Sequence, residues 1–188
     1  MMEADASDEE LLYRTAAGDR DAFVALYRRR QGPIYRFALH MSGSEAIAED
    51  VTQEVFLRLM RAPGGYDPAR AGLASYLYGM ARHLVFAAAR ARATIPAEDG
   101  HGHVPASVLD DLTRREAIDA VRSAVLSLPA RYREVVVLCD LEEMDYSQAA
   151  EALGCAVGTV RSRLHRARAL LAGKLRPRRG VRRELSGV

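Results

Sequence analysis

The chain has 188 residues, of which 49% are hydrophobic and 28% charged, and it carries a formal net charge of +2. That length suits one medium domain or two small ones, and the hydrophobic fraction is sufficient to bury their cores. No apolar run reaches the roughly 18 residues that a membrane-spanning helix needs, and the acidic first ten residues do not resemble a signal peptide, so the composition predicts a cytoplasmic protein without membrane insertion.

The first part of the chain, residues 8–92, has the periodicity of a small helical domain. Apolar spacing and helix breakers predict helices near residues 8–17, 20–41, 44–61 and 73–92. In the third of these, Val51, Val55 and Leu59 recur at steps of four and form an apolar stripe. Another side of the same helix gathers Asp50, Gln53, Glu54 and Leu57.

A segment without apolar periodicity follows at residues 93–111, and its Gly, Pro and polar content predicts a flexible linker. His101 and His103 lie in it without a third well-spaced ligand, so we expect no metal site and no cofactor. A second helical domain is predicted at residues 112–176, with a basic tail at 177–188. The expected fold is therefore all-α, with two small helical domains joined by a flexible linker.

The second domain begins with two helices whose apolar residues are predicted to face inward. In the first, these residues are Ile118, Val121, Val125 and Leu128. Pro129 opens the next helix, because proline is well tolerated in a first turn. The inward residues of that helix are Tyr132, Val135, Val136 and Cys139.

The end of the second domain has the pattern of a helix-turn-helix. Asp145 and Gln148 fit the N-cap and third position of a capping box, and Gly154 suits a tight helix exit. The next helix, Val157–Leu171, has an apolar stripe on one side and an arginine-rich polar face on the other. Basic residues greatly outnumber acids beyond residue 156, which predicts a surface that attracts phosphate.

These segments resemble the extracytoplasmic-function sigma factors, a group of the sigma-70 family. The segments similar to the domain that reads the promoter −35 element are 128–135, 141–154 and 157–168. Those similar to the polymerase-binding domain that reads the −10 element are 21–27, 48–59 and 76–85. Together they cover nearly the whole chain in the order expected of this family.

The resemblance implies three binding surfaces. Core RNA polymerase, through its clamp helices, is expected to bind Asp50, Gln53, Glu54 and Leu57. Melted −10 DNA is expected to contact Tyr76, Arg82 and His83. The −35 element is expected to contact Gly158, Thr159, Arg161, Ser162, His165 and Arg166.

The chain departs from the family pattern in the −10 segment. Tyr76 replaces the usual Trp, Gly79 a usual basic residue, and His83 a common Asn. Since His and Asn offer different donors and acceptors, the base preference is open.

The resemblance also implies partners: core RNA polymerase, including its flap, promoter DNA and an anti-sigma factor. No arrangement of catalytic residues is evident, so we expect a binding protein without enzymatic activity or a small-molecule substrate. Two alternatives remain open at this point. One is a helix-turn-helix regulator, and the other is a polymerase-binding adaptor without sigma activity.

Overall fold

The computed structural model describes residues 6–93 and 109–175, and every regular element in these ranges is helical, as predicted. The N-terminal half contains α1 (Asp8–Ala16), α2 (Arg20–Ser42), α3 (Glu45–Arg61), the short 3₁₀ helix η1 (Pro63–Gly65) and α4 (Leu73–Ala93). The C-terminal half contains α5 (Leu109–Leu126), α6 (Ala130–Val136), the π-helical turn η2 (Val137–Leu141), α7 (Tyr146–Leu153) and α8 (Val157–Leu175).

Short polar residues set the starts of the first three helices. The side chains of Ser7, Asp19 and Ser44 each accept hydrogen bonds from backbone N–H groups of the first turn of α1, α2 and α3. These caps satisfy donors that have no partner within the helix. The predicted stripe of α3 is confirmed, because Val51, Val55 and Leu59 are buried.

The start of the second half differs from the sequence prediction. Helix α5 already begins at Leu109, inside the segment 93–111 that was expected to be a linker. Residues 94–108, including His101 and His103, and residues 176–188, which contain the predicted basic tail, lie outside the described part of the chain.

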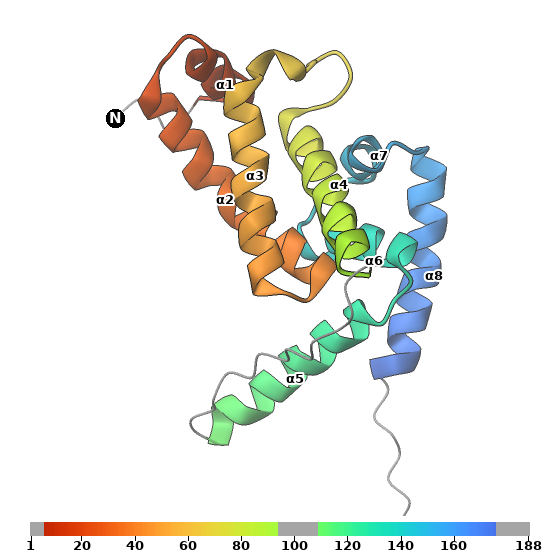
Figure 1. Ribbon diagram of the computed structural model, residues 1–188. Coiled ribbons are helices and arrows are strands. Elements are labelled where there is room, and N and C mark those ends of the chain that lie inside the picture. Colours follow the sequence, from red (N-terminus) through yellow and green to blue (C-terminus); the bar gives the residue numbers. More distant parts are fainter. Residues whose placement is uncertain (1–5, 94–108, 176–188) are drawn as a thin grey trace, which may run out of the picture.

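Another difference concerns the apolar face of α5. Val125 and Leu128 are buried as predicted, but Ile118 and Val121 are 48% and 42% exposed. Figure 1 shows the reason, since the N-terminal part of α5 projects away from the remaining helices. The prediction that these two residues face inward was therefore wrong for the described structure.

The two halves of the molecule share one continuous core. Its largest fully buried side chains include Leu26, Phe37 and Leu77 in the first half and Leu138 and Leu164 in the second. In Figure 1, α4 lies between α3 and α7, and α8 lies on the outer side of the second half. No helix in the described ranges is both long and apolar enough to cross a membrane.

Candidate nucleic-acid interfaces

The predicted helix-turn-helix is formed by α7 and α8. Asp145 accepts hydrogen bonds from the backbone N–H groups of Ser147 and Gln148, at 2.8 and 2.9 Å, and the Gln148 side chain accepts one from the N–H of Asp145 at 3.2 Å. Gly154 ends α7 with a φ of 62°, a left-handed conformation that glycine adopts without strain. Both the capping box and the glycine exit are therefore confirmed.

Helix α8 buries one side and leaves the other open. Val160, Leu164 and Ala167 are buried against the second half of the core. The opposite side contains every residue predicted for −35 binding. Thr159 is half-exposed, and the exposed ones are Gly158, Arg161, Ser162, His165 and Arg166. An exposed polar face with its small residues at the N-terminal end matches the geometry of a helix that enters a major groove by that end.

Two arginines of this face already interact with tyrosine side chains. The Arg161 guanidinium lies 5.7 Å from the centre of the Tyr146 ring, at the N-terminal end of α7. Arg166 points toward α6, where its hydrogen bond lowers the pKa of the Tyr132 hydroxyl. Arg131 stacks over the same Tyr132 ring at 4.9 Å. The sequence pattern treats the two arginines alike, whereas the structure gives them different neighbours.

The predicted polymerase face lies on α3. Asp50 and Gln53 are exposed, while Glu54 and Leu57 are half-exposed. Glu54 accepts a hydrogen bond of 2.7 Å from Arg58, one helical turn later. An exposed pair of this kind contributes only about 0.3–0.5 kcal/mol, so it does not prevent this face from binding a partner.

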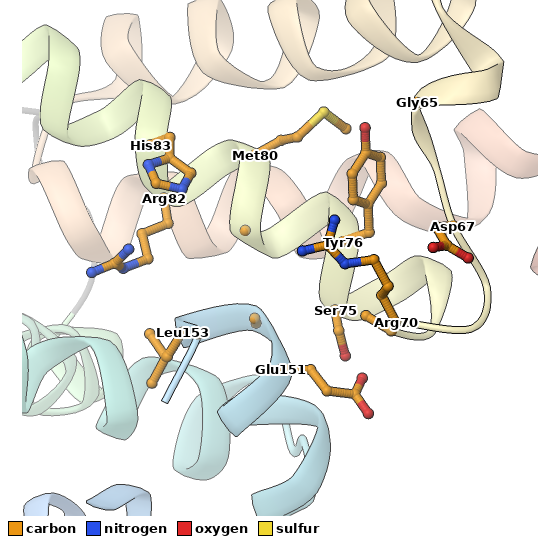
Figure 2. A pocket seen from close by; sticks show the side chains of 14 residues that line it. Gly65, Asp67, Arg70, Ser75, Tyr76, Met80, Arg82, His83, Glu151 and Leu153 are labelled. Carbon is orange, nitrogen blue, oxygen red and sulfur yellow. The ribbon is translucent and has the colours of Figure 1, made fainter. Parts of the chain in front are cut away.

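The predicted −10 residues lie on α4, beside a cleft between α4 and α7. Figure 2 shows Tyr76, Arg82 and His83 on the α4 side and Glu151 and Leu153 on the α7 side. The Tyr76 ring is half-buried and packs 5.5 Å from that of Tyr66. His83 is exposed. The structure thus gathers all three predicted residues along one side of α4.

Arg82 does not face open solvent, because it is paired with the second half of the chain. Its Nε donates a hydrogen bond of 2.7 Å to Glu134 of α6, whose side chain is only 3% exposed. Arg82 also lies 5.2 Å from the centre of the Phe86 ring. Sequence reasoning missed Glu134, since its partner is 52 residues away in the chain and no local spacing links the two.

A second carboxylate, Glu142, joins the two halves at the end of η2. It accepts hydrogen bonds from Arg36 of α2 at 2.9 and 3.1 Å and from the Tyr78 hydroxyl of α4 at 3.2 Å. Burial raises the pKa of Glu142, and the bond from Arg36 opposes that shift. Burial, together with the neighbouring Glu142 charge, also raises the pKa of Tyr78. The hydroxyl therefore stays protonated and remains a donor at neutral pH.

Comparison with known proteins assigns each half to a described region. The family model "Sigma-70 region 2" matches residues 26–94, and "Sigma-70, region 4" matches residues 118–171. The extracytoplasmic-function sigma factor SigM of Mycobacterium tuberculosis is 36% identical over 171 residues, which cover 88% of this chain and 83% of that protein. SigE of Mycolicibacterium smegmatis is 34% identical, and the match covers 81% of this chain but only 62% of SigE.

Solved structures show the same fold. CnrH, in complex with the cytosolic domain of CnrY, superposes with a TM-score of 0.66 at 26% identity, covering 88% of this chain and 95% of CnrH. The sigma factor RpoE of Bartonella quintana, in complex with the anti-sigma factor NepR, gives a TM-score of 0.62 at 24% identity, covering 79% of this chain and 93% of RpoE. The arrangement of two helical domains is therefore shared with both proteins.

Proposed function

Because the chain belongs to the extracytoplasmic-function sigma factors of the sigma-70 family, we propose that it binds core RNA polymerase and directs promoter-specific initiation of transcription. The observation that carries this proposal is the exposed polar face of α8 on a capped helix-turn-helix, preceded in the chain by the polar face of α3 and the aromatic side of α4. In this role the protein acts by binding and performs no chemistry itself.

Each of the three surfaces has its own proposed binding role. Residues 8–92 form the domain that binds polymerase and −10 DNA, and residues 112–176 form the domain that reads the −35 element. On α3, Asp50 and Gln53 are exposed at the proposed contact with the clamp helices. On α4, Tyr76 supplies an aromatic face for an unstacked base, and such stacking contributes about 1–3 kcal/mol. Its neighbours Arg82 and His83 supply charge and hydrogen bonds.

On α8, the residues at the N-terminal end contact base edges in the major groove, as in other helix-turn-helix proteins. The exposed apolar residues Ile118 and Val121 of α5 provide a surface for the polymerase flap. An anti-sigma factor is the proposed regulator, because RpoE of Bartonella quintana, which shares the fold, was solved in complex with one.

Run-off transcription with purified core polymerase and genome fragments tests the proposal. A sigma factor yields promoter-specific transcripts with core polymerase alone, and we expect that result. A helix-turn-helix regulator gives none until another sigma factor is added. A polymerase-binding adaptor associates with core polymerase but forms no open complex, which permanganate footprinting detects.

A further inference from the structure

Helix α1 is bonded to the start of α4 through Glu9. The Glu9 carboxylate accepts a hydrogen bond of 3.2 Å from the backbone N–H of Leu73, the first residue of α4, which is 64 residues away in the chain. The first N–H groups of a helix have no partner within it, and Gly72, which precedes α4, has no side chain that could accept one. Glu9 therefore supplies from another helix the acceptor that a capping residue normally supplies.

The same oxygen of Glu9 also meets Tyr66, in the loop between η1 and α4. The Tyr66 hydroxyl donates to it over 3.5 Å, which is long for such a bond. Partial burial acts to raise the pKa of Glu9, but hydrogen bonds from its own N–H, the Leu73 N–H and the Tyr66 hydroxyl lower that pKa overall. Glu9 is therefore ionised at neutral pH and acts only as an acceptor.

Helix α1 is fixed to α2 by contacts that do not involve Glu9. Asp8, the preceding residue, is buried and pairs with Arg29 at 2.9 Å and with Arg30, both on α2. Leu11, on the next turn of α1, is buried in the core. Figure 1 shows α1 beside η1, and α1 also contacts α4. The position of the Glu9 carboxylate is thus set by α1 and α2, not by the loop to which it bonds.

Both donors to Glu9 are neighbours of Tyr76. The ring centres of Tyr66 and Tyr76 are 5.5 Å apart, and Leu73 lies in the same first turn of α4 as Tyr76, with its side chain fully buried. Figure 2 shows the Tyr76 ring beside the loop that carries Gly65, where a Cβ atom would lie only 3.3 Å from the Tyr76 hydroxyl oxygen. The orientation of the Tyr76 ring therefore depends on where this loop and the first turn of α4 lie.

We propose that Glu9 is a positioning residue for −10 recognition, which holds Leu73 and Tyr66 so that the Tyr76 ring keeps the orientation in which it meets an unstacked base. The inference rests on the proposed function and adds α1 to the −10 site. In this role Glu9 does not touch DNA and acts only through Tyr76. Its loss should have the size of a lost helix cap, about threefold in promoter opening.

Two neighbouring carboxylates on α1 provide a matched pair of variants. Glu9→Ala removes the acceptor of the two hydrogen bonds. Glu10→Ala removes an equal charge from the same first turn of α1, at an exposed position. Glu9→Gln is the conservative variant, since its amide oxygen still accepts the N–H of Leu73. Asp8 continues to hold α1 on α2 in all three variants, so each chain should fold.

The functional measurements are permanganate reactivity of the promoter and association with core polymerase. Glu9→Ala should lower promoter opening about threefold with unchanged association, whereas Glu10→Ala and Glu9→Gln should stay near the wild type. In a Tyr76→Ala background, Glu9→Ala should have no further effect, because Glu9 acts through the Tyr76 ring. A merely structural role would lower opening in both backgrounds.

A spectroscopic measurement on the full chain without polymerase follows the Tyr76 ring directly. Tyrosines are replaced by 3-fluorotyrosine, and the fluorine resonance of Tyr76 is identified as the one that Tyr76→Phe removes. Glu9→Ala should shift this resonance, because the ring loses its fixed surroundings. Glu10→Ala should leave it in place.

An unmoved Tyr76 resonance or unchanged promoter opening in Glu9→Ala overturns the inference. So does an equal loss of opening in Glu10→Ala, a further loss in the Tyr76→Ala background, or a Glu9→Gln variant as defective as Glu9→Ala. The proposed function is judged separately by run-off transcription. Promoter-specific transcripts that do not depend on Glu9 would remove only its positioning role. A shifted Tyr76 resonance in a chain that yields no transcripts would remove the sigma activity and leave the hold on Tyr76 in place.

Discussion

The two helices proposed to meet promoter DNA are presented in opposite ways. The polar face of α8 is exposed, with Arg161, Ser162 and His165 open to solvent. The corresponding side of α4 packs against α7, and its Arg82 is paired with Glu134. The comparison teaches that a DNA-binding sequence does not by itself make a DNA-accessible surface. In this chain the helix proposed to read duplex DNA is exposed, whereas Arg82 on the helix proposed to bind single-stranded DNA is already paired.

The largest expected effect is a loss of polymerase binding from changes on α3. The polar face of α3 is exposed, as that of α8 is. Replacing Asp50 and Glu54 together with Arg should weaken association with core polymerase about tenfold or more, because like charges across an interface cost several kcal/mol. Each domain should remain folded, since exposed substitutions shift stability by only about 0.5 kcal/mol. A pull-down with core polymerase measures the association, and unchanged binding would contradict the assignment of this face.

The next prediction divides the open face of α8. Arg161→Ala should lower discrimination among −35 elements by about 1–3 kcal/mol, because residues near the N-terminus of such a helix reach base edges. Arg166→Ala should weaken binding to all elements alike and reduce its salt dependence, since Arg166 is turned toward Tyr132 on α6. Competition binding of holoenzyme to a −35 mutant panel at two salt concentrations distinguishes them. Equal profiles for the two variants would contradict this division.

A smaller effect is expected on the covered side, at α4. Tyr76→Ala should reduce promoter opening by an amount near the lower end of about 1–3 kcal/mol, because the ring is already half-buried beside Tyr66. Permanganate reactivity of the melted region reports the opening, and core binding should not change. Tyr13→Ala on α1, which removes an aromatic ring at an exposed site away from the proposed surfaces, serves as a control that should change neither. A parallel loss of core binding in Tyr76→Ala would make the residue structural instead.

The smallest expected effect concerns the pH dependence of the covered interface. Burial raises the pKa of Glu142 above its ordinary value of 4.5, and the like charge of the nearby Glu143 adds to this shift. The hydrogen bonds that Arg36 and Tyr78 donate to Glu142 oppose it. A carboxyl that holds its proton more tightly when folded adds stability below its ordinary pKa, and this stability is lost as the pH rises through the raised pKa. The wild-type chain should therefore lose stability relative to Glu142→Gln as the pH rises from 4.5.

Urea unfolding at a series of pH values measures this difference between the two proteins. The free energies of unfolding of the wild-type chain and Glu142→Gln should diverge by less than about 1.4 kcal/mol per pH unit, which is the limit for one proton. The other titratable groups contribute equally to both chains and cancel. A difference that does not change with pH would show that the Glu142 carboxyl has the same pKa in the folded and unfolded states.

The features that could be predicted from the sequence are local ones. The capping box of Asp145 and Gln148, the exit at Gly154 and the buried stripe of α8 depend on spacings of a few residues, so a helical pattern predicts them. The docking of the two halves depends on pairs such as Arg36 with Glu142, which are 106 residues apart in the chain. No periodicity brings such residues together. The same limit explains Ile118 and Val121, which are exposed although the pattern predicted them to be buried. Apolar spacing identifies one face of α5, but it does not show whether another helix covers that face.

Arg133 of α6 bonds to both halves of the chain and therefore affects the order in which the protein unfolds. Its guanidinium donates to the Met41 carbonyl of α2 at 2.6 Å and, within the C-terminal half, to the carbonyls of Leu126 and Leu128. If the halves part, the Met41 carbonyl passes to water while the other two acceptors keep their donor. The end of α5 thus remains tied to α6 without help from the rest of the chain. Calorimetry should consequently record the parting of the halves and the loss of each helical unit as separate transitions, rather than one endotherm for the whole protein.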